Sequence, residues 1–138
     1  MTEDRKPLLE FRAEGRITVG TVQALSVLST LNVAHFGKEA LDYVHAHPGL
    51  NLLLDFTHVG YLSSVVLSEL LRIKQAVYQV KGQLRLCGVS PTIQEVFKIT
   101  NLDRVFSIHG ESSDIDVKRF ERALEIAEEE DAWQGITE

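Results

Sequence analysis

The sequence predicts an α/β fold with a mainly parallel or mixed sheet, and three observations support this prediction. Two short β-prone runs, residues 8–12 and 16–22, are separated by a segment that contains Gly15, which is typical of a hairpin. Behind the hairpin, segments with apolar residues at helical spacing alternate with short apolar runs. One run, residues 50–56, is apolar at nearly every position, as in a strand buried on both faces. We expect this run to be the central strand, with right-handed crossovers and about four helices around the sheet.

The first predicted helix comes after a stretch that the sequence leaves ambiguous. Residues 24–29 are compatible with one more short extended segment, and Thr30 is suited to cap the helix after it. From Leu31 onward, apolar residues recur at helical spacing. The helix should end near His47, because Pro48 disfavours helical conformation in the residue before it.

The second half of the chain continues the alternation of helices and strands. We expect a helix over residues 63–80, which begins at a serine pair, and a strand over residues 83–89. Residues 90–101 begin with Ser-Pro, a cap followed by a first-turn proline, and predict a third helix. A short strand is expected at residues 104–108 and a last helix over residues 112–127.

Length and composition indicate a single domain with one hydrophobic core. The chain has 138 residues, of which 44% are hydrophobic. We place the domain at residues 8–127. The charged residues 1–7 are expected to form a flexible N-terminus, and the acidic residues 128–138 a solvated C-terminal tail.

Charge and cysteine content restrict the class of partner. The formal net charge is −6, which disfavours nucleic acids and anionic membranes because both require a concentrated basic face. No uncharged apolar run approaches the ~20 residues of a spanning helix, and the N-terminus lacks the apolar segment of a secretory signal. The single cysteine, Cys87, is expected to be a small buried hydrophobe in a reduced protein. The sequence therefore predicts a cytoplasmic protein with protein or small-molecule partners, and it leaves a homodimer open.

The junction between the central strand and the next helix is the candidate functional site. In open α/β sheets, function gathers beyond the carboxyl ends of the strands, where loops and helix N-termini meet. Ser63 and Ser64 stand at such a helix N-terminus, beside unsatisfied backbone N–H groups. Each serine is suited to cap the helix or to accept a phosphoryl group, since a charge of about −2 is tolerated there. A nucleophilic serine is disfavoured, because the chain has no Gly-x-Ser-x-Gly motif.

Other polar residues of the junction have less specific signals. Asp55 ends the predicted central strand, and we expect its carboxylate to hold the loop by accepting hydrogen bonds from backbone N–H groups. The five histidines are scattered without the spacing of a metal site. His58 is kept as a candidate site residue only because it lies in the same loop as the serines. The chain has no glycine-rich phosphate loop. We therefore expect no catalytic residue, no metal and no cofactor.

The segment that runs from Asp55 to Ser64, Asp-Phe-Thr-His-Val-Gly-Tyr-Leu-Ser-Ser, resembles the signature of STAS domains, the fold of anti-sigma factor antagonists. In that family an Asp-hydrophobic-Ser/Thr-x-Val-x-aromatic-Ile stretch leads to Asp-Ser-Ser/Thr-Gly. The hairpin, the strand at 83–89 and the Ser-Pro helix start also match the family's layout, so the resemblance covers about residues 8–127. It implies a STAS-like mixed β-sheet with an N-terminal hairpin, flanked by helices.

The resemblance also implies a site and a kind of partner. It places the family's phosphoacceptor at Ser64, with Ser63 as the alternative; Ser63 stands where the family usually has Asp, and Val66 where it has Gly. Many family members are switched by a serine kinase of the anti-sigma type, which they bind when they are unphosphorylated. The partner-binding residues that this resemblance implies are Asp55, Thr57, His58, Ser63, Ser64, Val65, Val66 and Leu67.

These inferences together predict a non-enzymatic regulatory switch. The expected function is that of an anti-sigma factor antagonist that binds an anti-sigma factor/serine protein kinase and is phosphorylated at the helix N-terminus. Two alternatives stay open. One is a constitutive interaction scaffold that is never phosphorylated, and the other is a STAS module that senses a small ligand or nucleotide in a pocket at the strand ends.

Overall fold

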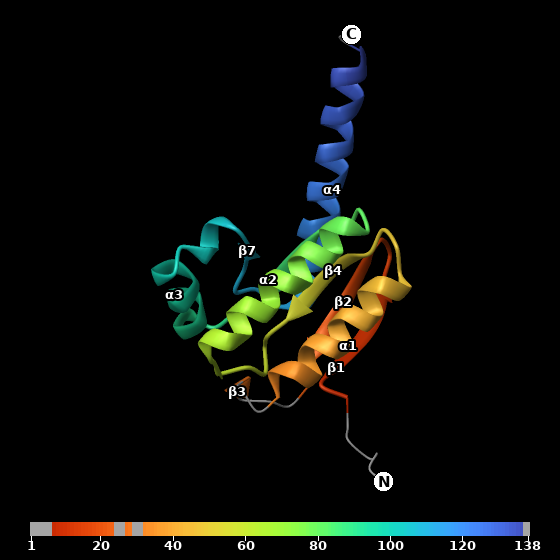
Figure 1. Ribbon diagram of the computed structural model, residues 1–138. Helices are drawn as coiled ribbons and strands as arrows, with labels where there is room; N and C mark the ends of the chain where they lie inside the picture. The colour runs from red at the N-terminus through yellow and green to blue at the C-terminus, as the bar shows by residue number, and fades with distance from the viewer. Residues whose placement is uncertain (1–6, 24–26, 29–31, 137–138) are drawn as a thin grey trace.

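In the computed structural model, which describes residues 7–23, 27–28 and 32–136, helices cover both faces of a five-stranded sheet (Figure 1). The spatial order of the strands is β1-β2-β4-β6-β7. The first pair is antiparallel and each later pair is parallel, so the predicted mixed sheet with an N-terminal hairpin is confirmed. The strands of this sheet are β1 (Leu9–Glu14), β2 (Ile17–Val22), β4 (Asn51–Asp55), β6 (Leu84–Cys87) and β7 (Ser107–Ile108).

The predicted central strand lies in the middle of the sheet as β4. Its three leucines are completely buried. Leu52 and Leu54 belong to the large core beneath the helices of one face, whereas Leu53 belongs to a smaller cluster on the opposite face. Because successive side chains of a strand point to opposite faces, an unbroken apolar run is what a sheet covered on both sides requires.

The helices are arranged in two layers. The pair α1 (Val33–Ala46) and α2 (Ser64–Gln79) lies side by side on one face, with α3 (Pro91–Ile99) beyond it (Figure 1). On the other face, Phe120 and Leu124 of α4 (Ser113–Ile136) pack against β2, β4 and β6. The sequence signal at Ser90 is confirmed, since its hydroxyl accepts a hydrogen bond from Ile93 N at 3.3 Å and caps α3.

Part of the region after α3 differs from the prediction. The strand expected at residues 104–108 is confirmed only at Ser107–Ile108, because a 3₁₀ turn, η1 (Leu102–Arg104), precedes it. Asn101 adopts a left-handed conformation with φ of 61°, which ends α3 and reverses the chain. Phe106 is then buried edge-on against Phe97, with ring centroids 5.7 Å apart. The apolar side chain of Phe106 is therefore explained by burial in the core, and the residue does not belong to a strand.

A second, two-stranded sheet lies beside the main one. β3 (Val27–Leu28) pairs in parallel with β5 (Tyr61–Leu62), although the sequence analysis placed no strand between the central strand at 50–56 and the helix from residue 63. The extended segment expected at 24–29 is confirmed at Val27–Leu28, and the rest of it lies outside the described residues. The expected cap Thr30 and helix start Leu31 also lie outside them, and α1 begins at Val33.

The last helix is longer than the sequence pattern indicated. Its periodic apolar residues stop near residue 127, yet α4 continues to Ile136 and projects away from the sheet (Figure 1). The acidic stretch that we expected to form a tail is therefore helical over residues 128–136. Among the described residues, none of the helices combines the length and the apolar character needed to cross a bilayer.

Candidate functional site

The candidate site lies where β5 passes into α2. β4 ends at Asp55, a loop comes next, and β5 leads into Ser63, which is the N-cap residue of α2. Ser63 has an extended backbone with φ of −88° and ψ of 166°, and Ser64 is the first helical residue. The sequence prediction of a helix that begins at the serine pair is thus confirmed.

The two serines occupy different environments. Ser64 is exposed, whereas Oγ of Ser63 is buried and has no hydrogen-bond partner among the described residues. Although Ser63 stands at the N-cap, its side chain makes no capping hydrogen bond. The first turn of α2 contains no acidic residue, so no side-chain carboxylate of that turn competes for the positive end of the helix dipole.

Two exposed apolar side chains lie within three residues of Ser64 in the sequence. Val65 is 42% exposed and Tyr61 is 55% exposed, while Val66 is completely buried and Leu67 nearly so. Of the two valines, one therefore faces solvent and one packs into the core. The predicted partner surface has four exposed residues, Thr57, His58, Ser64 and Val65, and one half-buried residue, Ser63.

Asp55 acts inside the loop. Its Oδ1 accepts hydrogen bonds from Thr57 N at 2.9 Å and from Thr57 Oγ1 at 2.6 Å, and the side chain is buried. Gly88, at the end of β6, packs against this Asp55–Thr57 bracket with φ of +63°, and a Cβ there would lie 2.7 Å from Asp55 Oδ1. The structure thus supports the role predicted for Asp55. Its carboxylate holds the loop by hydrogen bonds, and the exposed residues of the loop are positioned as a result.

A second cluster of titratable groups escaped the sequence analysis. One ligand atom from each of His109, Glu111 and Asp116 lies within 4.8 Å of the others. Asp116 is paired with Arg85 through hydrogen bonds of 2.8 and 3.0 Å, and Glu111 with Arg119 at 3.2 Å. Burial and the Arg85 guanidinium lower the pKa of His109. Because arginines already neutralise both carboxylates, the cluster is suited to hold α4 against the sheet rather than to bind a cation.

Comparison with known proteins places this geometry in context. The sequence model of the STAS domain matches residues 5–115. BtrV of Bordetella bronchiseptica, whose name describes an anti-sigma factor antagonist, is 32% identical over 73 residues. That segment is 53% of this chain and 62% of BtrV, so the chain spans less than two thirds of this relative's length.

Two solved structures show the same fold. An anti-sigma factor antagonist of Thermotoga maritima has a TM-score of 0.72 at 17% identity, with 82% of this chain and 94% of that chain covered. The Bacillus cell fate determinant SpoIIAA in its phosphorylated form has a TM-score of 0.61 at 15% identity, with 80% and 97% covered. At these identities the likeness concerns the fold alone.

Proposed function

Because this chain belongs to the STAS domain family, we propose that it is an anti-sigma factor antagonist. In this proposal it binds an anti-sigma factor of the serine-kinase type through the β5–α2 junction, and the kinase phosphorylates Ser64. The name of BtrV and the phosphorylated form of SpoIIAA support a protein of this kind. The function is regulatory and non-enzymatic, and the proposed place of action is the cytoplasm.

The observation that carries the assignment is the difference in exposure between the two serines. A kinase must bring its active site to the acceptor hydroxyl, and Ser64 offers an exposed hydroxyl on the first turn of α2. The hydroxyl of Ser63 is buried beneath the surface. Ser64 is therefore the proposed acceptor, and Ser63 shapes the helix start.

The electrostatics of the helix start suit a phosphate. A phosphoserine carries about −1.5 to −2 charges at neutral pH, and the N-terminus of a helix stabilises negative charge through its dipole and free N–H groups. The first turn of α2 has no acidic residue to repel the group. The modified protein would therefore keep its fold, and the modification would act on the surface.

The same phosphate would disrupt a docked partner. Val65 and Tyr61 give the junction an apolar surface, with Ser64 between them in the sequence. Placing a dianion in such a contact imposes a desolvation cost and repels acidic groups of the partner. Phosphorylation at Ser64 is thus proposed to switch the complex off.

Incubation with an anti-sigma factor kinase from the same organism and ATP tests the assignment. Mass spectrometry should locate the phosphate on Ser64, and Ser64→Ala should abolish incorporation. Ser68→Ala is the matched control, because Ser68 is also exposed on α2 and one turn further along, and it should leave incorporation unchanged. Phosphate on another residue, or incorporation that persists in Ser64→Ala, would contradict the assignment.

A constitutive scaffold is the competing function, and the exposed apolar side chain of Val65 favours it, since a permanent docking surface needs no switch. The phosphomimetic Ser64→Asp separates the two functions. The switch predicts that this variant loses binding to the kinase while Ser68→Asp retains it. Equal binding by both variants would support the scaffold.

A further inference from the structure

The second half of α4 extends past the core of the protein, and among its described side chains Glu128 keeps an ion pair with Arg16 of the hairpin. Among the side chains of α4 that the structure describes, Leu124 is the last one in the core, and every residue from 125 to 131 is exposed. The helix continues to Ile136, so twelve residues, about 18 Å at 1.5 Å per residue, extend past the core. Figure 1 shows this projecting end of α4, residues 125–136, rising beyond the C-terminal end of α2.

The projecting end of α4 is acidic, so a basic partner surface would complement it. Residues 125–131 contain five acidic side chains and no basic one, and the last turn of α4 has no basic residue. Acidic groups near a helix C-terminus oppose the helix dipole, and a short unsupported helix end is marginal in water. Glu125 and Glu128 are paired with Arg122 and Arg16. Within the described residues, Glu129, Glu130 and Asp131 have no ion pair.

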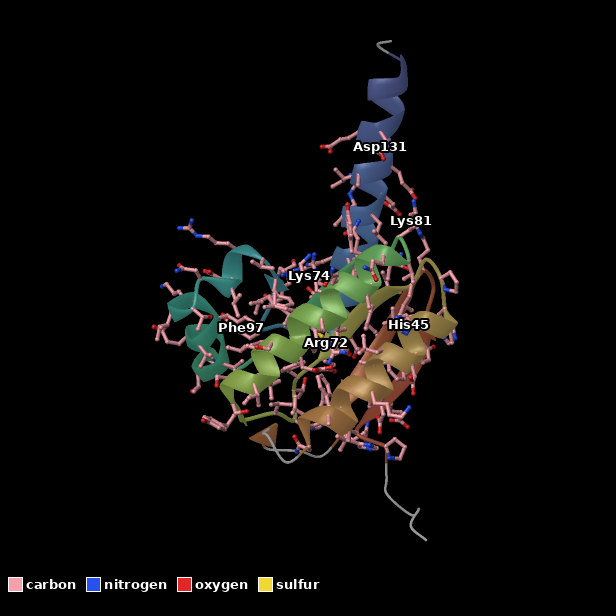
Figure 2. All side chains as sticks on the ribbon, in the orientation of Figure 1. His45, Arg72, Lys74, Lys81, Phe97 and Asp131 are labelled. Carbon is pink, nitrogen blue, oxygen red and sulfur yellow. The ribbon has the colours of Figure 1, made fainter. Side chains whose placement is uncertain are left out.

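A groove with the complementary chemistry lies at the same end of the molecule. Its volume is about 760 Å³, and it runs between the C-terminal end of α2, the start of β6 and the segment before β7. Lys74 and Lys81 line it, and neither makes an ion pair among the described residues. Tyr78, 76% exposed, and Val105, 44% exposed, add apolar surface. Figure 2 labels both lysines near the base of α4 and Asp131 on its projecting end.

We propose that two copies of this chain form a symmetric dimer in which the projecting end of α4 from each copy docks in the groove of the other. Glu129, Glu130 and Asp131 then face Lys74 and Lys81. Ile126, which is exposed on the same helix end, gains apolar contact with Tyr78 or Val105.

Geometry favours a second copy as the occupant. The helix and the groove lie at one end of the same molecule, but α4 points away from the body, so its tip does not fill the groove of its own chain. A twofold axis perpendicular to α4 would place the two projecting helices antiparallel, and each tip would then return to the partner's body. Such an interface is self-complementary, as a twofold dimer requires.

The dimer is independent of the proposed phosphorylation. Ser64 is at the first turn of α2, whereas the groove is lined by α2 residues from Lys74 to Gln79, about 15 to 22 Å further along the helix. The surface around Ser64 therefore remains accessible in the dimer.

Charge reversal with complementation tests the dimer. Sedimentation velocity of the full chain over a range of concentrations should show a monomer–dimer equilibrium. A groove variant, Lys74→Glu with Lys81→Glu, and a helix variant, Glu129→Lys with Glu130→Lys and Asp131→Lys, should each raise the dimer Kd at least about tenfold because both contacts become repulsive. An equimolar mixture of the two should dimerise again. In the mixed dimer the acidic groove meets the basic helix, and the unaltered lysine groove meets the unaltered acidic helix.

Matched controls make the result decisive. Lys98→Glu with Arg104→Glu changes the net charge by the same amount as the groove variant, on exposed residues of α3 and η1, and it should leave the dimer Kd unchanged. Trp133 is the only tryptophan of the chain, so its fluorescence anisotropy should report docking of the projecting end of α4 as concentration rises. A chain that stays monomeric, or a dimer indifferent to both reversals, would overturn the proposal. Failure of the mixture to associate while both variants remain folded by circular dichroism would overturn it too.

Discussion

Arg85 on β6 holds Asp116 on α4 through two hydrogen bonds, from Nε to Oδ2 at 2.8 Å and from Nη2 to Oδ1 at 3.0 Å. Asp116 is completely buried, and the guanidinium also lies over the Phe120 ring, 5.7 Å from its centroid. The rest of this layer is the apolar cluster of β2, β4, β6 and α4. This ion pair therefore fixes where α4 sits on the sheet.

We predict that Asp116→Asn lowers the free energy of unfolding by about 3 kcal/mol, because it leaves the Arg85 charge buried without a counter-ion. Urea denaturation at fixed protein concentration measures the change. Asp114→Asn is the control, since Asp114 is exposed in the same turn and should cost less than about 1 kcal/mol. The double variant Arg85→Leu, Asp116→Leu should be more stable than Asp116→Asn alone. If Asp116→Asn and Asp114→Asn had equal effects, the pair would not anchor α4.

The Asp55–Thr57 bracket gives a second prediction. Thr57→Val keeps the side-chain shape and removes the 2.6 Å hydrogen bond to Asp55 Oδ1, so we expect a loss of about 1 kcal/mol in unfolding free energy. Asp55→Ala removes the acceptor of both hydrogen bonds and should cost more. Hydrogen exchange of the amides in 57–62 should accelerate in both variants. Thr92→Val, at an exposed residue of α3, should change neither quantity.

Much of the fold was predictable from local sequence signals. The apolar run at 50–56 identified the central strand, and Ser90-Pro91 identified the start of α3. These signals are local, because an unbroken apolar run and a cap followed by proline are each patterns of residues that are adjacent in sequence. The short pairing of β3 with β5 was not predictable, since two residues of each strand carry too little pattern.

The candidate site was predictable in place but not in detail. The structure has the strand-to-helix junction where the sequence predicted it. The resemblance preferred Ser64 and kept Ser63 as the alternative, but only packing distinguishes the buried Oγ of Ser63 from the exposed Ser64. The sequence likewise could not tell which of Val65 and Val66 is exposed. The side of a first helical turn that faces the core depends on how the whole helix packs on the sheet. The cluster at Asp116 escaped notice because Arg85 is distant in sequence.

Cys87 gives a third prediction, about chemical reactivity. Burial, followed by the negative charge of Asp55, raises the pKa of the Cys87 thiol far above its ordinary value. The thiolate is the reactive form, so the native protein should resist Ellman's reagent at mildly alkaline pH and react fully in urea. Ser68→Cys, on the exposed face of α2, should react at once and serves as the positive control. Rapid native labelling of Cys87 would show that β6 opens readily.

His109 makes the stability of the fold dependent on pH. Burial lowers its pKa, and so does Arg85; Arg119 adds a weaker lowering effect, while Asp116 and Glu111 oppose these effects. In the unfolded chain the imidazole titrates near about 6.5, so below that pH the unfolded state binds a proton that the native state does not. This contribution to stability is therefore present above about pH 6.5 and is lost as the pH falls through the lowered pKa of the folded protein.

We predict that His109→Gln, which cannot be protonated, loses less stability than the wild type between about pH 8 and about pH 5. Thermal and urea denaturation at both pH values measure the difference. His45→Gln, at an exposed histidine of α1, should keep the wild-type dependence. Identical pH profiles for His109→Gln and the wild type would mean that the β7–α4 connection does not resist protonation of His109.

Because the imidazole lies within the cluster of Arg85 and Asp116, a proton there adds positive charge beside the guanidinium that anchors α4. Loss of α4 from the sheet should therefore precede global unfolding at acid pH, and hydrogen exchange in the first half of α4 should reveal it.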